Sequence, residues 1–397
     1  MKLNFYHDSV IIYSKAKDIF YSSSLSKAVW DRYLNVFSLV KVHTRTKQNV
    51  SENINLAISS GENVSIEPIR TYTSLKSLLS FTKVYNEIKH TIDNESYFVL
   101  RLPSMIGYIA GVILIKNKKK YYVEVVGCGK DALFYKGGLL SKIISLPSYY
   151  LQKYITNNAS VAIYITENYL QSKYPSKGEI YSGVSNVTLN FDNYDEKLIN
   201  NRIYRFTSKN KNSIIKIGLI ASLDVKYKGH KVAFKTIKLL KEKGYNIQLE
   251  LVGHGTLESW QDILKKYNIE DNVIHHGMLP SGEGIYNWLQ TIDIYIQPSL
   301  TEGHGRALVE AVYNGCIAFG TNTGGIPDTL DLSYTFKKND YMKLSELIEK
   351  AINNEDYSAN NIRTNFSNVK KYEQSHIESL RTTSLKKYAD IVNKDEV

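Results

Sequence analysis

Cysteine is scarce in this chain and long hydrophobic segments are missing, and each shortage excludes a class of protein. The 397 residues include two cysteines, Cys128 and Cys316, which cannot form a disulfide framework and lack metal-ligand spacing, so a reducing compartment is expected. The longest apolar run, residues 105–115 (MIGYIAGVILI), is too short to cross a bilayer. Because Asp8 interrupts the amino-terminal apolar residues, they do not resemble a signal peptide, and we expect a cytoplasmic protein.

Acidic residues are also few in the first half of the chain. Residues 1–180 contain 23 Lys and Arg against 13 Asp and Glu, whereas the remainder is nearly balanced, with 27 against 26. This excess favours a polyanion or an anionic membrane face as a partner, and a solvated basic surface explains it equally well. The sequence has no zinc-finger spacing, RNP-like aromatic motif or basic heptad region, so nucleic acid is not an expected partner. A basic nucleic-acid-binding protein stays open as an alternative.

The order of the predicted elements indicates an α/β protein with two Rossmann-like domains that face a central cleft. In both halves, apolar β-branched runs alternate with stretches of helical periodicity, which predicts parallel sheets covered by helices on both faces. We place the domains at residues 1–185 and 205–370, with a polar linker region at about 177–213. A carboxyl-terminal helix at about 375–397 can return to pack on the first domain.

Polar or glycine-rich stretches follow five predicted strands of the second half. These stretches are SLDVKYKGH (222–230), GHG (253–255), HGMLPSGEG (276–284), SLTEGHGR (299–306) and TNTGGIPD (321–328). In open parallel sheets, ligands bind at the carboxyl ends of the strands, which all lie on one rim. The sequence therefore predicts a binding site on that rim.

One of these stretches places two glutamates around a glycine-rich turn. In PSLTEGHGRALVEAVYNG (298–315), Glu302 follows a predicted strand, and Glu310 lies in the helix after it. Gly303 and Gly305 let the backbone approach a ligand closely, and the start of the helix offers N–H groups to an anion. The alternative for this stretch alone is an ordinary βα turn with two solvated glutamates.

Together these motifs resemble the donor-binding domain of a GT-B glycosyltransferase of family GT4 (glycosyltransferase group 1), a retaining family that uses nucleotide-sugars. The resemblance extends from about residue 214 to 330. EGHGRALVE resembles the E-x7-E motif, YKG the segment with the phosphate-binding lysine, LVGHG the turn beside the nucleotide, and GGIPD the Gly-Gly-x-Pro-acidic element. The first half resembles the family only in its element order and in RLPS followed by a helix. Ser222 stands where many members have an arginine.

The resemblance implies a hexosyltransferase that moves a sugar from an NDP-sugar to a glycan acceptor in bacterial capsule, O-antigen or exopolysaccharide assembly. It assigns catalysis to Glu302 and Lys228. The implied donor-binding residues are Ser222, Gly253, His254, Gly255, Met278, His304, Gly305, Arg306, Ala307, Leu308 and Glu310. The candidates on the acceptor side are Arg101, Ser104, Cys128 and Asp131. A GT-B-fold nucleotide-sugar epimerase or hydrolase is the alternative.

The leaving diphosphate needs positive charge, and the sequence contains no Asp-x-Asp pair to hold a divalent metal. We therefore expect Lys228, Arg306 and the helix start after Gly305 to supply that charge, with no metal and no cofactor. A lipid-linked oligosaccharide acceptor, with peripheral contact at the anionic inner face of the plasma membrane, would explain the apolar run 105–115 and the lysines at 116–120. A core helix is the simpler explanation of that run.

Overall fold

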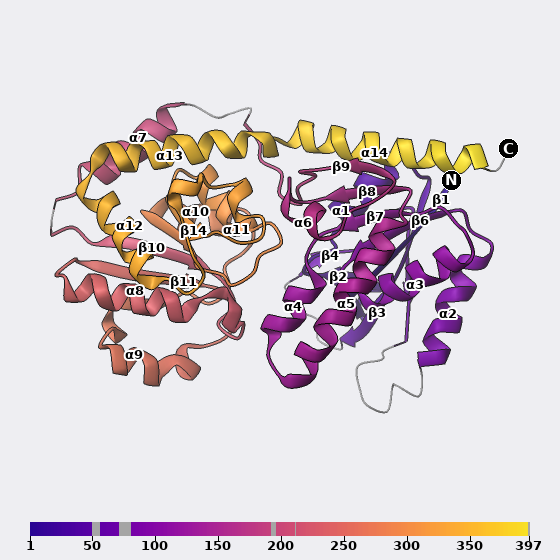
Figure 1. Cartoon of the computed structure of the whole chain (residues 1–397), viewed down its shortest axis with the longest axis horizontal. Helices are drawn as coiled ribbons and strands as arrows, with labels where there is room; N and C mark the ends of the chain where they lie inside the picture. The colour runs from indigo at the N-terminus through magenta and orange to yellow at the C-terminus, as the bar shows by residue number, and fades with distance from the viewer. Residues whose placement is uncertain (50–55, 71–80, 192–195, 211, 396–397) are drawn as a thin grey trace. The chain divides into compact units, whose positions relative to one another are not determined.

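The computed structural model describes residues 1–49, 56–70, 81–191, 196–210 and 212–395 (Figure 1). They fall into two units. Unit 1 comprises Met1–Lys130, Ile143–Val184 and Ser375–Val397, and unit 2 comprises Asp131–Lys142 and Ser185–Gln374. Residues 131–142, which the sequence places in the first domain, are thus grouped with unit 2.

Unit 1 is built on a mostly parallel sheet whose longest strand, β1 (Lys2–Ser14), connects two parts of it. The strand order is β4-β2-β1-β6-β7-β8-β9, and β3 and β5 branch from β1. The first half of β1 pairs in parallel with β6, and its last residues pair antiparallel with β2. The remaining strands are β2 (Ile19–Ser22), β3 (Leu39–Asn49), β4 (Ala57–Ile58), β5 (Val64–Pro68), β6 (Tyr97–Leu102), β7 (Tyr122–Val125), β8 (Val161–Tyr164) and β9 (Glu179–Tyr181).

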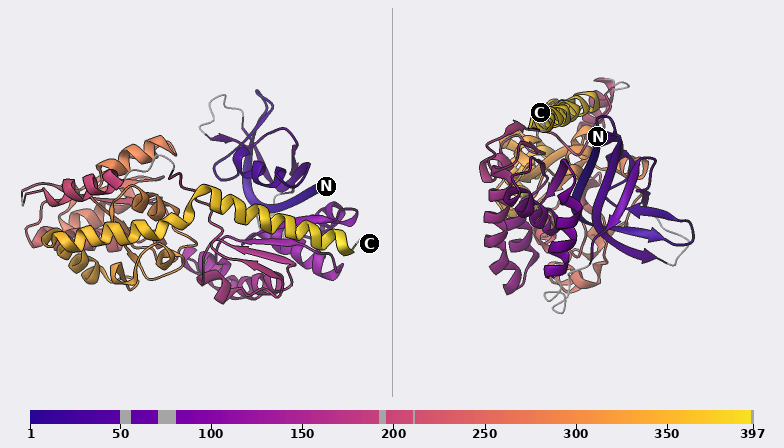
Figure 2. Two further views of the ribbon diagram at one scale, coloured as in Figure 1. Left: turned by 90° about the horizontal axis from the view of Figure 1, so that it is seen from above. Right: turned by 90° about the vertical axis from the view of Figure 1, so that its right-hand side faces the viewer.

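Helices cover both faces of this sheet (Figures 1 and 2). Successive side chains of a strand point to opposite faces, so each strand contributes buried side chains to two hydrophobic cores, one on each face. In β6, Phe98 and Leu100 join the core under α2, α3 and α5, whereas Tyr97 and Val99 join the core under α1 and α14. The Tyr388 hydroxyl of α14 accepts a 2.7 Å hydrogen bond from the Phe98 amide. The helices are α1 (Lys27–Leu34), α2 (Phe81–Asp93), α3 (Met105–Lys116), α4 (Gly129–Lys136), α5 (Leu139–Asn157), α6 (Tyr169–Lys173) and α14 (Gln374–Asp395).

The apolar run 105–115 forms α3, a helix of the core. Eight of its twelve residues are buried, and Ser104 caps its first turn by accepting a hydrogen bond from the Gly107 amide. Lys119, in the lysine run that follows, donates to three backbone carbonyls between residues 92 and 95. The structure therefore supports the core-helix explanation of this run. No helix in the described part of the chain is long and apolar enough to cross a membrane.

Unit 2 contains a fully parallel sheet in the order β12-β11-β10-β13-β14-β15. Its central strands are almost entirely buried, as expected for a parallel sheet covered on both faces. From β10 the chain builds outward to β12 and then crosses to β13, so the strand order reverses between β10 and β13. The strands are β10 (Ile215–Ile220), β11 (Ile247–Val252), β12 (Val273–His275), β13 (Ile294–Gln297), β14 (Ile317–Thr321) and β15 (Thr335–Phe336).

The predicted linker is partly structured, because residues 177–213 contain β9 and α7 (Glu196–Thr207). The Arg202 guanidinium of α7 is buried and donates to the carbonyls of Gln290 and Ile292, which fastens the helix to unit 2. Amphipathic periodicity alone did not reveal this helix, since its buried face is anchored by a charged side chain. The other α-helices of unit 2 are α8 (His230–Glu242), α9 (Gln261–Tyr267), α10 (Glu283–Thr291), α11 (Arg306–Tyr313), α12 (Tyr341–Asn353) and α13 (Glu355–Val369).

Candidate functional site

Lys228 and Glu302 meet at the point where the strand order of unit 2 reverses. Lys228 lies in the short helix η2 (Lys226–Lys228) after β10, and Glu302 lies in the turn after β13. The Nζ atom of Lys228 is 2.7 Å from Oε1 of Glu302, and the two side chains are 26% and 9% exposed. A reversal of strand order opens a crevice at the carboxyl ends of the strands, where ligands bind. The two residues assigned to catalysis therefore form one ion pair at the expected position.

A network of polar side chains holds Glu302 in one orientation. Its Oε1 atom also accepts hydrogen bonds from the Ser299 hydroxyl at 2.8 Å and from the Gln297 amide at 2.9 Å. The side-chain amide oxygen of Gln297 in turn accepts from the hydroxyl of Tyr295, which is fully buried. All three donors converge on Oε1, and among the described residues Oε2 accepts no hydrogen bond. Sequence reasoning missed Gln297 and Ser299, although both are polar residues at the end of an apolar strand.

Two glycines allow the loops around this pair to touch. Gly229 has φ +85°, and a Cβ there would lie 2.0 Å from the carbonyl oxygen of Pro298. Gly324, in the GGIPD stretch, has φ +60°, and a Cβ there would lie 2.0 Å from the Glu302 carbonyl oxygen. Only glycine fits positions that combine a left-handed backbone with such close approach. The YKG and GGIPD stretches thus both pack against the segment that carries Glu302.

The helix α11 begins directly after this turn and adds charge to the site. Gly305, at its N-cap, has φ +81°, and Arg306 is its first residue, with an exposed side chain. A helix leaves its first amides without intrahelical partners, so those of Arg306 and Ala307 can bind an anion. Glu310 lies one turn further along and is partly buried. Burial raises the pKa of Glu310, and the nearby Arg306 guanidinium opposes this shift.

His304 occupies the interior beneath the turn. Its ring packs edge-on against Tyr372 with centroids 4.8 Å apart, and it is 3% exposed. Neither ring nitrogen has a hydrogen-bond partner among the described residues. Burial, with Lys371 and Arg306 nearby, lowers the pKa of His304 to about 4. The imidazole is therefore neutral at physiological pH and does not add positive charge for a diphosphate.

The glycine turn after β11 contacts the loop after β10. His254 Nδ1 lies 2.8 Å from the Asp224 carboxylate, and both side chains are largely exposed. Gly253 and Gly255 have positive φ values of 150° and 102°, and both lie close against residues 221–224 of that loop. Ser222, in the position where an arginine is common, accepts a hydrogen bond from the Asp224 amide at 3.3 Å. Asp224 had not been recognised as part of this site.

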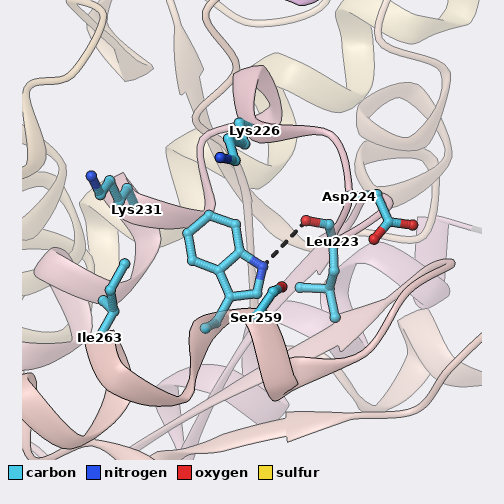
Figure 3. A pocket seen from close by; sticks show the side chains of 7 residues that line it. Leu223, Asp224, Lys226, Lys231, Ser259 and Ile263 are labelled. Atoms are coloured by element: carbon cyan, nitrogen blue, oxygen red, sulfur yellow. Dashed lines mark hydrogen bonds between the residues drawn. The ribbon is translucent and has the colours of Figure 1, made fainter. Parts of the chain in front are cut away.

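A cavity of about 390 Å³ lies beside this loop (Figure 3). Its floor is apolar, and its polar edge carries Asp224 and two lysines. The indole N–H of Trp260 donates to the Leu223 carbonyl at 3.2 Å and thereby closes one wall. The lining residues are Leu223, Asp224, Lys226, Lys231, Ser259, Trp260 and Ile263.

The other predicted donor-side residues differ in accessibility. Met278, after β12, is 65% exposed, whereas Leu308 is completely buried in the core under α11. Leu308 can therefore offer a ligand its backbone but not its side chain. Lys228 and Glu302, the residues assigned to catalysis, contact each other directly through their side chains. Met278 and Glu310 lie on the same rim, and within the described part of the chain neither side chain forms a hydrogen bond or ion pair with that pair.

The predicted acceptor-side residues lie at the carboxyl ends of β6 and β7, except Asp131, which is in the first turn of α4. Arg101 is 3.7 Å from the buried carboxylate of Glu124. The Cys128 thiol is buried and lies 3.0 Å from the Tyr174 hydroxyl. Ser104 serves as the α3 cap described above.

Two residues near this edge were not identified from the sequence. The Asp8 carboxylate accepts hydrogen bonds from the Met105 and Ile106 amides at the start of α3. His7 Nδ1 lies 3.1 Å from the Arg101 carbonyl, and burial together with the Arg101 charge lowers the pKa of His7 to about 4. Both residues lie within β1. The sequence around them is polar and therefore did not predict a strand there. Within the described ranges, no group of three or more His, Cys, Asp and Glu side chains could hold a metal ion.

Comparison with known proteins identifies relatives over the whole chain. A family model described as "Glycosyl transferases group 1" matches residues 203–368. The chain is 40% identical over 395 residues to Protein CapJ of Staphylococcus aureus, covering 99% of this chain and 97% of that protein. It is 25% identical over 301 residues to the capsular polysaccharide biosynthesis glycosyltransferase CapM of S. aureus, covering 72% and 74%. A crystal structure of Anabaena HepE in complex with UDP-glucose has a TM-score of 0.63 at 13% identity, covering 97% and 99%. This likeness confirms the expected GT-B fold.

Proposed function

The chain belongs to the group 1 glycosyl transferases, and from that premise we propose that it transfers a sugar from a nucleoside-diphosphate sugar to a glycan with retention of configuration and without a metal ion. The observation that supports this most is the Lys228–Glu302 pair at the reversal of the unit 2 sheet. Retention is proposed because the spacing of Glu302 and Glu310 resembles the E-x7-E motif of retaining GT4 enzymes.

Lys228 is the residue best suited to the leaving diphosphate. An ammonium group has three N–H donors, and the ion pair with Glu302 uses one of them. The side chain is 26% exposed, so the other donors can reach phosphate oxygens while the pair is kept. Arg306 and the first amides of α11 add further positive charge on the next loop of the rim. Fixed charges of this kind stabilise the diphosphate as it departs, which is our reason for proposing a metal-independent reaction.

The two glutamates suit the two sugars of the donor. Glu302 is fixed through Oε1 and presents Oε2, so it can accept a hydroxyl of the transferred sugar or stabilise positive charge that develops there. Glu310 lies one turn into α11, beyond the amides proposed for the diphosphate, and is proposed to accept the ribose hydroxyls. The diphosphate would then lie between them at the start of the helix.

We further propose a role in bacterial capsular polysaccharide assembly. CapM carries that role in its name, and CapJ is similar over nearly the full length of both chains. The acceptor is proposed to be a glycan or a lipid-linked oligosaccharide. Because a lipid-linked acceptor is held at a membrane, the enzyme is proposed to contact the anionic inner face of that membrane peripherally. Arg101 and Ser104, at the carboxyl edge of the unit 1 sheet, are proposed to lie on the acceptor side.

A thermal-shift screen over nucleotide-sugars tests the donor class. A ligand that binds only the folded chain raises the melting temperature by mass action. The screen should begin with UDP-glucose, because HepE binds it in its crystal structure. A shift with one nucleotide-sugar that is lost in Lys228→Ala supports the proposal. The absence of any shift across uridine, guanosine and adenosine diphosphate sugars would contradict it.

The assay must also separate transfer from hydrolysis or epimerisation, since a related enzyme with the same donor site needs no acceptor. Donor consumption is measured with and without a membrane extract that contains acceptor lipids. Consumption that depends on the extract and labels a lipid-linked product supports transfer. Equal consumption in both reactions would identify an epimerase or hydrolase.

A further inference from the structure

The cavity beside the loop after β10 lies between the starts of α8 and α9. These helices connect β10 to β11 and β11 to β12, so the chain moves in one direction along the strand order, whereas α11 connects β13 to β14 in the other direction. Because crossovers between parallel strands are right-handed, the two groups of helices cover opposite faces of the unit 2 sheet (Figure 1). The cavity is therefore separate from the α11 amides proposed for the diphosphate.

The cavity has the size and the walls of a small-molecule site. Its volume of about 390 Å³ falls within the range of about 300–1,000 Å³ that is usual for such sites. The floor is apolar, because Leu223 and Trp260 are 1% and 6% exposed. The Trp260 ring packs edge-on against Phe234 with centroids 5.5 Å apart, and its N–H is bonded to the Leu223 carbonyl. These contacts fix the floor in the absence of a ligand.

The charged side chains of the lining leave an excess of positive charge. Lys226 and Lys231 line the cavity together with one carboxylate, that of Asp224, and Figure 3 shows these three side chains along one edge. The Asp224 carboxylate is already paired with His254 at 2.8 Å. Within the described part of the chain, neither lysine ammonium group forms an ion pair or a hydrogen bond. Both lysines are therefore available to an anionic ligand, and phosphate is an anion that lysine commonly binds.

The rest of the lining suits a sugar ring attached to that anion. Ile263 and the indole of Trp260 offer apolar surface to the C–H face of a pyranose. The Ser259 hydroxyl and the Asp224 carboxylate can form hydrogen bonds with sugar hydroxyls. A phosphate monoester carries close to two negative charges at neutral pH, which the two lysines match.

We propose that this cavity is a binding site for a phosphorylated monosaccharide, separate from the donor site. Neither Lys228 nor Glu302 lines it, and no lining residue was assigned to the donor or to catalysis. The site therefore goes beyond the proposed transfer reaction and does not depend on it.

Calorimetric titration of the full-length chain with glucose 1-phosphate and glucose 6-phosphate tests the proposal. At least one of them should bind more tightly than glucose, inorganic phosphate or glucuronate, because the first two lack part of the contacts and the third carries a single charge. Its affinity should fall as salt rises, since screening weakens the lysine contacts. An excess of uridine, guanosine or adenosine diphosphate should leave the affinity unchanged, because the residues proposed for the donor lie outside the cavity.

Exposed residues of the lining provide the test variants. Lys231→Gln and Lys226→Gln should each weaken sugar phosphate binding about tenfold, the value of one hydrogen bond to a charged group. Ser259→Glu adds a carboxylate to the lining and should abolish measurable binding. The matched control is Lys266→Gln, which removes an exposed lysine of α9 outside the cavity and should bind like the wild type. All four variants should keep the wild-type melting temperature, because the replaced side chains are exposed.

Four outcomes would overturn the proposal. They are no binding of either sugar phosphate at millimolar concentration, equal losses in the Lys231 and Lys266 variants, displacement by a nucleoside diphosphate, and equally tight binding of inorganic phosphate or glucuronate. Displacement would place the sugar phosphate in the donor site, and tight glucuronate binding would assign the cavity to acidic sugars. Sugar phosphate binding in a chain that binds no nucleotide-sugar would leave this site standing and contradict the proposed function instead.

Discussion

Replacing Glu302 by glutamine removes one negative charge from the candidate site and little else. The amide has nearly the same size, and its oxygen can still accept hydrogen bonds from Ser299 and Gln297, which hold the present carboxylate at 2.8 and 2.9 Å. The turn should therefore keep its geometry. If Glu302 faces the transferred sugar, the lost charge matters most in the transition state, where positive charge develops on the sugar. We expect kcat to fall while the donor KM changes little.

The size of the effect follows from the hydrogen bond that is weakened. A hydrogen bond to a charged group contributes about 1.5–3 kcal/mol, which corresponds to a fall in kcat of about ten- to a hundredfold. The ion pair predicts a second effect of opposite sign. Glu302 competes with a diphosphate for the Lys228 ammonium, 2.7 Å away, so the free nucleoside diphosphate should bind Glu302→Gln at least as tightly as the wild type. Steady-state kinetics measures the first effect, and isothermal titration calorimetry measures the second.

The control is Glu258→Gln, which removes a carboxylate from an exposed position in unit 2 (η3, Leu257–Trp260) and should leave both quantities unchanged. A wild-type kcat in Glu302→Gln would refute the catalytic assignment. A raised KM at constant kcat would instead show that Glu302 contributes uniform binding, the role proposed for Glu310.

Three further predictions concern the donor. Lys228→Ala should weaken binding of the free nucleoside diphosphate about ten- to a hundredfold by calorimetry, because the lysine meets the diphosphate in donor and product alike; unchanged affinity would make it a surface lysine. Glu310→Gln should raise the donor KM, and it should also raise the melting temperature at neutral pH. Burial raises the pKa of the folded Glu310 above its ordinary value of 4.5, so its ionisation opposes folding at higher pH, and the gain should vanish below 4.5. Turnover should survive EDTA; loss that only a divalent metal restores would show that the reaction needs a metal.

Local sequence patterns were sufficient to predict most of unit 2. Its strands are short apolar runs, and its helices have apolar residues at three- and four-residue spacing, so each element can be recognised without its neighbours. The carboxyl-edge loops followed from the alternation of strands and helices, because all strands of a parallel sheet end on the same rim. The motif residues Lys228, Glu302 and Glu310 lie on the rim for that reason.

Unit 1 was less predictable, since its decisive features depend on contacts distant in sequence. β1 runs through His7 and Asp8, polar residues that gave no strand signal. They lie where the pairing of β1 with β3 shifts register between Tyr6 and Val10, and their side chains bond to the Arg101 carbonyl and to the α3 amides. Helix α5 has its apolar side chains outside, because Gly127, Gly129 and Tyr108 provide partners for its polar side. Periodicity locates such a helix and cannot say which face is buried.

The sequence by itself determined the α/β class, the two-unit plan and the chemical identity of the candidate site, since these follow from local periodicity and from residue types. Tertiary structure alone decided which of those residues meet. Lys228 and Glu302 are 74 positions apart, and they form a pair because β10 and β13 are neighbours where the strand order reverses. It also decided that His304 is buried and neutral while Arg306, two residues later, is exposed and charged. Burial and long-range pairing are properties of the packed chain, and the protonation and reach of each side chain depend on them.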